Sequence, residues 1–203
     1  MKKLEADIVI VGTGASGLFA ALHVPNDKKV LMLTKSDAEN SDSFLAQGGI
    51  CVLRDKNDFD SFMEDTMKAG HYENRKESVE IMINSSRDII NELIGYGVDF
   101  ATKDGELDYT REGAHSKPRI LFHEDITGKE ITQTLLTAAK IKENIEICEY
   151  MTMVDLISKD NTVCGIIAMD RNDQAFPVYS QYVVLACGGF GGLFKNSTNF
   201  SHI

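Results

Sequence analysis

Several features of specialised proteins are missing from this sequence. It has no long hydrophobic run, because the apolar stretch at residues 8–11 is far too short for a signal-peptide core or a membrane span. Its four cysteines form no C-x-x-C pair and have no zinc-ligand spacing, which favours reduced thiols. We therefore expect a cytoplasmic protein that binds neither a membrane nor a metal ion.

Basic residues are also in the minority. The 203 residues include 21 Lys and Arg against 31 Asp and Glu, which gives a formal net charge of −10. A nucleic-acid site or an anionic lipid surface needs clustered positive charge, so we expect neither partner. The composition, 43% hydrophobic and 26% charged, is that of an ordinary globular protein and excludes a disordered chain.

A glycine-rich motif stands near the N-terminus. The run at residues 7–11, apolar and β-branched after Asp7, predicts a strand that is buried on both faces. The sequence G-T-G-A-S-G follows at residues 12–17, and after it come a helical stretch at 18–22 and a second buried strand at 30–34. The G-x-G-x-x-G pattern alone is a weak signal, but in this context it is typical of the βαβ unit that binds dinucleotides.

The three glycines have separate roles in such a unit. Gly12 permits a tight turn, Gly14 lets the backbone approach a diphosphate, and Gly17 lets the helix and strand pack closely. The N-terminus of the helix presents unpaired N–H groups to the anion. An acidic residue that binds the ribose normally follows the second strand, but residues 34–36 are Thr-Lys-Ser here. This absence disfavours NAD as the ligand and leaves FAD open.

Apolar periodicity predicts the remaining elements and an α/β fold. The predicted helices lie at residues 58–70, 76–96 and 127–142, and the predicted strands at 119–122, 145–148, 153–158, 162–169 and 182–186. The strands on either side of the turn at 159–161 predict an accessory β-meander beside a Rossmann-like parallel sheet. We expect the helix at 76–96 and the strand at 182–186 to be largely buried, because both are rich in apolar residues.

Further segments carry a resemblance to a known family. F-L-A-Q-G-G at residues 44–49, Y-T-R-E-G-A-H-S at 109–116, D-I-T-G-K-E at 125–130 and A-C-G-G at 186–189 resemble the L-aspartate oxidases, in the same order. Those flavoproteins belong with the succinate dehydrogenase and fumarate reductase flavoproteins. The resemblance spans nearly the whole chain. It implies that residues 1–203 form one FAD-binding domain that is incomplete, without the family's capping and C-terminal helical domains.

The resemblance also implies a set of residues that bind FAD. The glycine turn would hold the diphosphate, Lys35 would lie at the adenosine ribose, residues 42–49 would surround the flavin, and Met153 would contact the adenine. The implied cofactor residues are Gly12, Thr13, Gly14, Ala15, Ser16, Gly17, Lys35, Asp42, Ser43, Phe44, Leu45, Ala46, Gln47, Gly48, Gly49 and Met153. The FAD is expected to be noncovalent, because Asp42 stands where the succinate dehydrogenase branch has its flavin-linking histidine.

For the substrate, the resemblance implies contacts from Glu112 and His115. Glu112 matches a residue that recognises the substrate ammonium, and Gln47 stands where the dicarboxylate dehydrogenases usually have Glu. The implied activity is oxidation of L-aspartate to iminosuccinate, with oxygen or fumarate as acceptor. That is the first step of NAD biosynthesis through quinolinate, which implies a functional link to quinolinate synthase.

No catalytic residue is assigned within this chain, because the family's substrate-clamping and acid–base arginines have no counterpart in it. We therefore expect the chain alone to be inactive. Two alternatives stay open at this point: a soluble flavoprotein like fumarate reductase or succinate dehydrogenase, and a noncatalytic module that holds FAD or another nucleotide.

Overall fold

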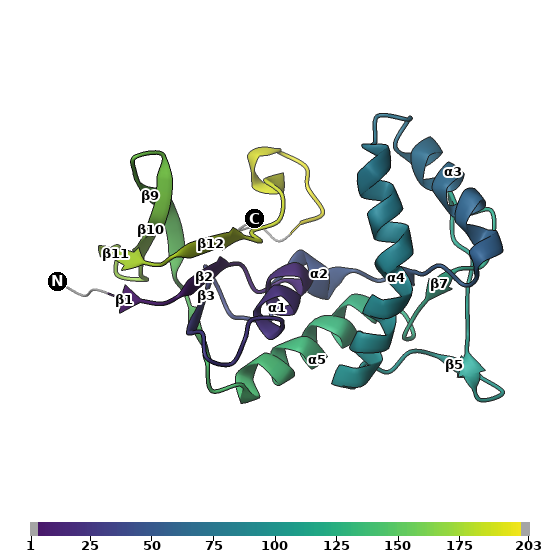
Figure 1. Cartoon of the computed structure of the whole chain (residues 1–203), viewed down its shortest axis with the longest axis horizontal. Helices are drawn as coiled ribbons and strands as arrows, with labels where there is room; N and C mark the ends of the chain where they lie inside the picture. The colour runs from purple at the N-terminus through teal and green to yellow at the C-terminus, as the bar shows by residue number, and fades with distance from the viewer. Residues whose placement is uncertain (1–3, 200–203) are drawn as a thin grey trace. The chain divides into compact units, whose positions relative to one another are not determined.

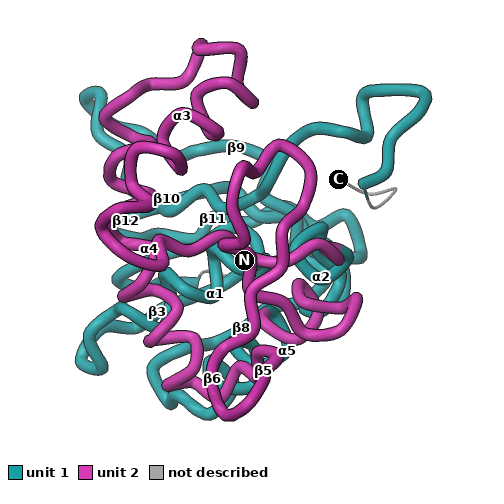
Figure 2. The backbone as a smooth tube through the Cα atoms, turned by 90° about the vertical axis from the view of Figure 1, so that its right-hand side faces the viewer, with its two compact units in different colours: residues 1–45, 132–203 teal, residues 46–131 magenta. Residues whose placement is uncertain are grey.

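The computed structural model describes residues 4–199 and contains two compact units. Residues 1–45 and 132–203 make up the first unit, and residues 46–131 make up the second (Figure 2). Each unit has elements and a core of its own.

The first unit is built on a four-stranded parallel sheet, as the sequence predicted. Its strands are β2 (Ile8–Val11), β3 (Val30–Thr34), β8 (Ile145–Glu149) and β12 (Tyr182–Leu185), in the spatial order β12-β2-β3-β8. Strands β12, β2 and β3 are labelled in Figure 1. Helix α1 (Ala15–Leu22) joins β2 to β3. Strand β3 is buried along its whole length, which agrees with its continuous apolar sequence because both faces of a central parallel strand are covered.

A second sheet in the same unit contains the predicted β-meander. Strands β9 (Thr152–Lys159), β10 (Thr162–Met169) and β11 (Ala175–Tyr179) pair antiparallel, and the short strand β1 (Leu4–Glu5) pairs parallel with β11. The turn between β9 and β10 places Asp160 and Asn161 at φ values of +50° and +59°, a conformation that these residue types tolerate. The meander prediction is confirmed, and β11 is an additional strand.

Side chains from both sheets form the core of the first unit. The buried residues of this cluster are Val9, Val11, Leu31, Leu33, Met151, Ile166, Ala168, Phe176 and Val178. Alternate residues of β11 contribute to the cluster, because Phe176 and Val178 are buried while Ala175 and Tyr179 are exposed. Burial of these side chains on folding is the main favourable term that holds the two sheets together.

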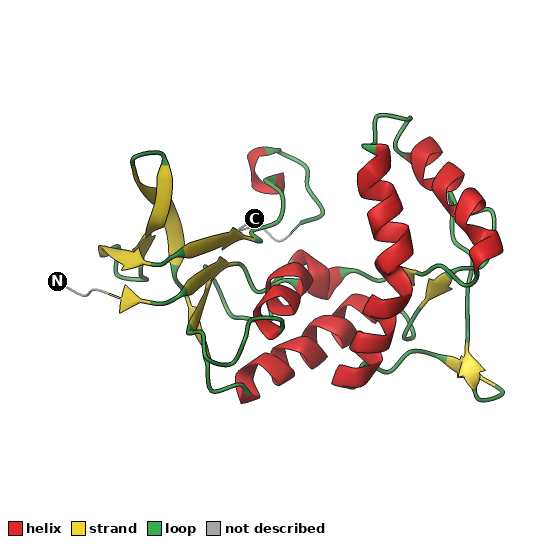
Figure 3. Cartoon of the chain, in the orientation of Figure 1, coloured by secondary structure: helices red, strands yellow, loops and turns green. Residues whose placement is uncertain are grey.

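Helices dominate the second unit (Figure 3). Its main elements are a 3-10 turn (η1, Lys56–Asp58), helix α3 (Phe59–Ala69) and helix α4 (Lys76–Tyr96). Two short antiparallel strand pairs complete it: β4 (Ile50–Cys51) with β7 (Ile120–Leu121), and β5 (Thr102–Lys103) with β6 (Glu106–Leu107). Phe62 of α3 packs against Val79 and Ile83 of α4.

Three short elements remain. Helix α2 (Asp42–Leu45) ends the N-terminal part of the first unit, and a 3-10 turn (η2, Gly191–Leu193) follows β12. Helix α5 (Thr127–Ile141) begins in the second unit and continues into the first. Along the chain from residue 4 to residue 199, no helix is both long enough and apolar enough to cross a membrane.

Two burial predictions are wrong. Helix α4 has the predicted bounds, but only Val79, Ile83, Ile90 and Leu93 are buried, and Ile81 is 63% exposed. These four residues recur at helical spacing and mark one buried face, so the other apolar residues of α4 lie off that face. Strand β12 stands at the edge of the parallel sheet, paired with β2 among the described strands, and its Leu185 is 54% exposed.

Two glycines allow three backbone segments to meet at the end of β2. Gly12 has a φ of +110°, and a Cβ atom at this position would lie 2.3 Å from the carbonyl oxygen of Ala186 after β12. A Cβ atom on Gly17 in α1 would lie 2.1 Å from the carbonyl oxygen of Gly12. The predicted roles of Gly12 and Gly17 are therefore seen in the packing: only residues without a side chain fit at these two points.

We expect Gly17→Ala to destabilise the first unit by about 1–3 kcal/mol, because the added methyl group would be forced against the backbone. Gly95 offers a matched control, since it is also in a helix and has open space around its Cα atom. Gly95→Ala should instead increase stability by about 0.5–1 kcal/mol, since alanine favours the helix. Urea unfolding measures both changes, and equal effects would contradict the packing argument.

Candidate functional site

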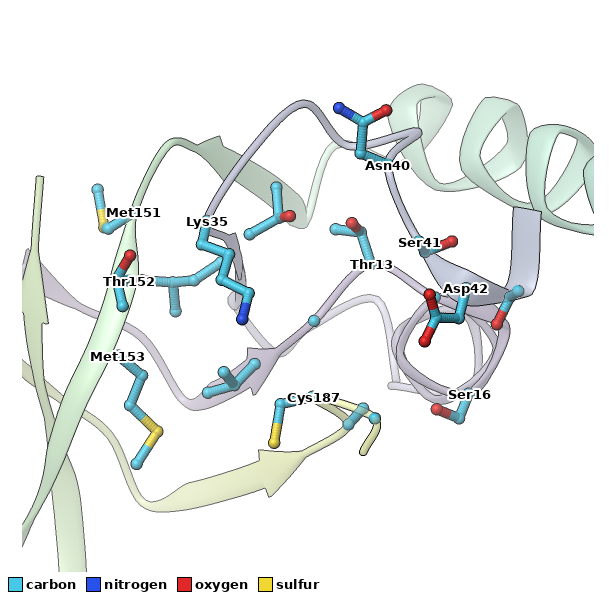
Figure 4. A pocket seen from close by; sticks show the side chains of 18 residues that line it. Thr13, Ser16, Lys35, Asn40, Ser41, Asp42, Met151, Thr152, Met153 and Cys187 are labelled. Carbon is cyan, nitrogen blue, oxygen red and sulfur yellow. The ribbon is translucent and has the colours of Figure 1, made fainter. Parts of the chain in front are cut away.

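A cavity of about 240 Å³ opens at the carboxyl ends of the parallel strands in the first unit. This edge is where ligands bind in open α/β sheets. The residues that line it are Val11, Gly12, Thr13, Gly14, Ser16, Leu33, Thr34, Lys35, Asn40, Ser41, Asp42, Ser43, Met151, Thr152, Met153, Ala186, Cys187 and Gly188 (Figure 4). All of them belong to the first unit, and we refer to this space as the dinucleotide cavity.

Thr13 has a polar atom in this cavity without a partner. Its side chain is 3% exposed, and its Oγ1 atom makes no hydrogen bond in the structure. An unsatisfied buried hydroxyl costs about 1–3 kcal/mol, so its presence indicates that a ligand atom completes the site. The hydroxyl can both donate and accept a hydrogen bond.

The N-terminus of α1 lies beside Thr13. Gly14 precedes the helix and makes no side-chain cap, so the first turn retains N–H groups that can face an anion. One of them is already used, because the Ala15 N–H donates to Ser43 Oγ over 3.1 Å. A Cβ atom on Gly14 would lie 3.1 Å from the same Ser43 oxygen. Gly14 and Ser43 therefore lie in close contact, and α2 is held against the glycine turn.

The opposite part of the cavity receives side chains from β3 and β9. Lys35 follows β3 and extends toward the middle of the cavity, with Met151, Thr152 and Met153 beside it (Figure 4). The Met151 N–H donates to the carbonyl oxygen of Thr34 over 2.8 Å. This bond ties the start of β9 to the end of β3, so a cationic side chain and an apolar wall share one end of the cavity.

The structure gathers about half of the predicted cofactor residues around the cavity. Those that line it are Gly12, Thr13, Gly14, Ser16, Lys35, Asp42, Ser43 and Met153. Ala15, Gly17, Phe44 and Leu45 belong to the same unit but do not line it, and Ala46, Gln47, Gly48 and Gly49 belong to the second unit, where all four are exposed.

Sequence reasoning missed other lining residues. Asn40 and Ser41 line the cavity just before α2, and Met151 and Thr152 line it at the start of β9. Ser41 could have been found from the sequence, because serine is a common residue at the start of a helix. In the structure its Oγ accepts a hydrogen bond from the Phe44 N–H over 3.3 Å. Cys187 of the A-C-G-G segment also lines the cavity.

In the second unit, Glu112 lies against Gly48. A Cβ atom on Gly48 would come within 3.3 Å of the Glu112 Oε2 atom. Gln47 Nε2 donates to Asp125 Oδ2 over 3.5 Å. Glu112 is therefore a close neighbour of Gly48, and Asp125 of Gln47, although the members of each pair are more than sixty residues apart in the sequence.

His115, the second predicted substrate residue, is half-buried between two partners. Its Nε2 atom lies 3.4 Å from Cys51 Sγ, and its Nδ1 atom lies 3.2 Å from Arg119 Nη1. Burial raises the pKa of the Cys51 thiol, while the positive charge of Arg119 lowers it and the negative charge of Glu112 raises it further. Cys51 is therefore a neutral thiol around neutral pH.

Cys51 and His115 also line a second cavity, of about 500 Å³, within the second unit. The other residues that line it are Gly49, Ile50, Phe62, Asp65, Thr66, Ala69, Met82, Ser85, Ser86, Ile89 and Ala114. The walls are mainly apolar, and the hydroxyl groups of Thr66, Ser85 and Ser86 donate to backbone carbonyls of their own helices. Within residues 4–199, no cluster of side chains has the composition of a metal site.

Arg119 is a fully buried charge that the sequence did not reveal. Its Nε and Nη2 atoms donate to the two carboxylate oxygens of Asp58 over 3.0 and 2.8 Å, and Nη1 donates to Asp65. Hydrogen bonds from Arg119 lower the pKa of Asp58 to about 2, against the opposing effect of burial. Burial raises the pKa of Asp65, but hydrogen bonds from Ser116 and Arg119 outweigh it and leave that pKa below its usual value.

A family model described as an FAD binding domain matches residues 7–203. The chain belongs to this FAD-binding family. The model spans the glycine turn and every residue that lines the dinucleotide cavity.

The curated relatives of this FAD-binding chain are L-aspartate oxidases. That of Clostridium acetobutylicum is 47% identical over 197 residues, and that of Clostridium perfringens is 44% identical over 197 residues. Both alignments cover 97% of this chain and 45% of the relative. The chain therefore spans less than half the length of these relatives.

A solved structure has the same fold as this FAD-binding chain. It is described as a quinol-fumarate reductase with menaquinol molecules, and the match has a TM-score of 0.91 at 25% identity. It covers 98% of this chain and 36% of the other. The predicted α/β, Rossmann-like FAD-binding fold with a parallel sheet is confirmed.

The residues of the dinucleotide cavity fit FAD. The unpartnered Thr13 hydroxyl and the uncapped start of α1 suit a diphosphate. The Lys35 ammonium, in the part of the cavity with the methionines, can donate to the oxygens of an adenosine ribose. The methionine side chains at the other end suit an adenine ring, because a polarizable thioether packs well on an aromatic face.

Thr13→Val should have opposite effects on stability and binding. Removing an unsatisfied hydroxyl should stabilise the FAD-free protein by about 1 kcal/mol, while loss of a hydrogen bond to a charged ligand should weaken FAD binding about tenfold. Ser180→Ala is the matched control, because Ser180 Oγ is also buried and unpartnered but lies outside the cavity. Fluorescence titration with FAD and urea unfolding separate the two effects. Equal FAD affinity in both variants would show that the Thr13 hydroxyl does not bind FAD.

The Asp58–Arg119 pair should make stability depend on pH only in strong acid. The pKa of Asp58 is lowered from 3.8 to about 2 on folding, so its stabilisation is fully present above about pH 4 and disappears as the pH falls through 2. This pKa shift corresponds to a contribution of roughly 2 kcal/mol to the free energy of unfolding.

Asp58→Asn should lower the free energy of unfolding by about 3–5 kcal/mol near neutral pH, because it leaves a buried guanidinium without its main partner. Asp88→Asn, at an exposed position of α4, should change stability little, and urea unfolding compares the two variants.

Proposed function

We propose that this chain is the FAD-binding part of an L-aspartate oxidase, with both compact units belonging to one domain. The proposed reaction is oxidation of L-aspartate to iminosuccinate, with oxygen or fumarate as the electron acceptor. The observation that carries the proposal is the contact between Glu112 and Gly48, which brings a carboxylate suited to an ammonium group against the A-Q-G-G segment. The names and identities of the two clostridial relatives support it independently.

The proposed cofactor contacts follow from the residues of the dinucleotide cavity. Thr13 and the first N–H groups of α1 would hold the diphosphate, and Lys35 would lie at the adenosine ribose. Met153 would lie at the adenosine end. We propose that Ala46, Gln47, Gly48 and Gly49 surround the flavin ring, as the resemblance implied. When bound, FAD supplies the two-electron acceptor that amino-acid oxidation requires.

The proposed substrate contacts depend on charge. The Glu112 carboxylate would pair with the ammonium of L-aspartate, a group that succinate and fumarate lack. His115 would offer a hydrogen bond from the same loop. A dicarboxylate also needs positioned cations and a proton acceptor. We assign neither to the described residues and propose that they lie in parts of the longer protein, so that this chain alone does not turn over.

Two rival functions remain distinguishable from this proposal. A flavoprotein that reduces fumarate would have the same fold, as the structural neighbour shows, but would gain nothing from a carboxylate aimed at an ammonium. A noncatalytic FAD-binding module would have the dinucleotide cavity but would not need Glu112. The cytoplasmic location and the functional link to quinolinate synthase stay predictions.

The deciding experiment is anaerobic addition of L-aspartate to the flavin-loaded protein in its full length. Bleaching of the flavin absorbance by L-aspartate, and not by succinate, is the expected result. Acid precipitation of the same sample should release the flavin into the supernatant, because the cofactor is proposed to be noncovalent. A flavin that L-aspartate leaves oxidised would refute the proposed activity, whatever its effect on fumarate.

Glu112→Gln should raise the KM for L-aspartate at least tenfold while changing fumarate reduction little. An ion pair with the substrate ammonium is lost, and such charge-assisted bonds contribute about 1.5–3 kcal/mol. Glu106→Gln on strand β6 is the matched control, since it removes one exposed carboxylate from the same unit. Steady-state kinetics with both substrates tests the assignment. An equal loss with aspartate and fumarate would show that Glu112 does not read the ammonium.

A further inference from the structure

Arg119 contacts three parts of the second unit at once. Its hydrogen bonds reach Asp58 of the 3-10 turn η1, Asp65 of α3 and His115 of the loop at residues 109–118. Its Nη2 atom also donates to Ser61 Oγ over 3.0 Å. A guanidinium has five N–H groups, and these bonds use all of them. Arg119 therefore has no donor left for a ligand, and any role in function must pass through its partners.

The contact with His115 determines which imidazole nitrogen carries the proton. The guanidinium can only donate, so the Nδ1 atom of a neutral His115 must accept from Arg119 Nη1. The proton of that imidazole is then on Nε2, which points toward Cys51 Sγ at 3.4 Å. A thiol sulfur is a weak acceptor, so this N–H is available to a stronger one, such as a carboxylate oxygen.

The same cluster holds the two residues that follow His115. The backbone N–H and the hydroxyl of Ser116 both donate to Asp65 Oδ2 over 2.7 Å, and Lys117 Nζ lies 3.4 Å from Asp58 Oδ1. Three consecutive loop residues are thus bound to the two aspartates and the arginine. Glu112 lies three residues before this anchored stretch, and its backbone carbonyl accepts the His115 N–H over 3.3 Å.

We propose that Arg119 is a positioning residue for the substrate loop: it holds His115 as an Nε2–H donor that binds a substrate carboxylate, and it prevents His115 from acting as a base through Nε2. The part about substrate rests on the proposed function, whereas the protonation of His115 does not. The substrate class is a carboxylate-bearing amine, with the ammonium at Glu112 and a carboxylate oxygen at His115.

The first test reads the His115 protonation directly. Long-range ¹H–¹⁵N spectra of the ¹⁵N-histidine-labelled chain should show the Nε2–H form of His115 near neutral pH, identified by its absence in His115→Gln. In Arg119→Gln the Nδ1–H form should appear in comparable amount, whereas Arg75→Gln, an equal charge change at an exposed site, should leave the spectrum unchanged. An Nδ1–H form in the wild type, or an unchanged ratio in Arg119→Gln, would overturn the proposal. If Arg119→Gln fails to fold, the wild-type spectrum and the kinetic test below decide it.

The second test uses kinetics of the full-length enzyme. His115→Gln retains an N–H donor that does not titrate and should keep kcat/KM for L-aspartate within about fivefold of the wild type. His115→Leu has no donor, and its kcat/KM for L-aspartate should fall at least tenfold, chiefly because KM rises. If both variants instead lose kcat equally, together with the acidic limb of the pH–rate profile, His115 is a base and the proposal fails. A wild type inactive toward L-aspartate would refute the proposed function, and the spectra would still decide the protonation of His115.

Discussion

The dinucleotide cavity depends on the approach of three backbone segments at the end of β2. The carbonyl of Gly12 lies where a side chain on Gly17 would be, and the carbonyl of Ala186 lies where a side chain on Gly12 would be. The N-terminus of α1 is thereby drawn over the edge of the sheet, and its free N–H groups face the space beyond the strands. A side chain at either glycine would push α1 outward and move the positive end of its dipole away from a bound diphosphate.

Thr13 shows how this arrangement trades stability for binding. A buried hydroxyl without a partner destabilises the protein as it stands. It lies between Gly12 and Gly14 in the lining of the dinucleotide cavity, where a bound ligand can supply the missing partner. Binding of a diphosphate would remove the penalty and add a charge-assisted bond. Part of the affinity for the ligand is thus stored in the ligand-free fold.

The sequence predicted those parts of the fold that depend on local patterns. The apolar runs of β2 and β3, the turn at Asp160 and Asn161 and the bounds of α4 all follow from the spacing of neighbouring residues. Strand β11 was missed because Pro177 stands at its centre, and proline is a poor signal for a strand. The exposure of α4 and β12 was also missed, since an apolar sequence does not say which face finds a partner. Burial is a property of the tertiary structure.

In the candidate site, too, some residues could be predicted from the sequence and others depend on the tertiary structure. Thr13, Lys35 and Ser43 were implied by the family resemblance, and all three line the dinucleotide cavity. The Asp58–Arg119 pair could not be predicted, because its members are 61 residues apart and the chain contains many other acidic residues that could have been the partner. The contact between Glu112 and Gly48 required knowledge of how β4 and β7 pair. The resemblance brought both residues to attention, but only the fold places them together.

The buried charges of the second unit have a physical reason in the loop that they hold. Between residues 109 and 118 this loop has no strand of its own and makes a single β-bridge, from Thr110 to Ile120. Backbone N–H and C=O groups that are not paired in a sheet need other hydrogen-bond partners. Asp65 supplies one by accepting a hydrogen bond from the Ser116 N–H. An apolar cluster could have filled the same volume at lower desolvation cost, but it has no directional bonds with which to fix a loop. Arg119 and its two aspartates therefore contribute conformational specificity more than stability, and a loop that must present Glu112 and His115 in one geometry is where such specificity is needed.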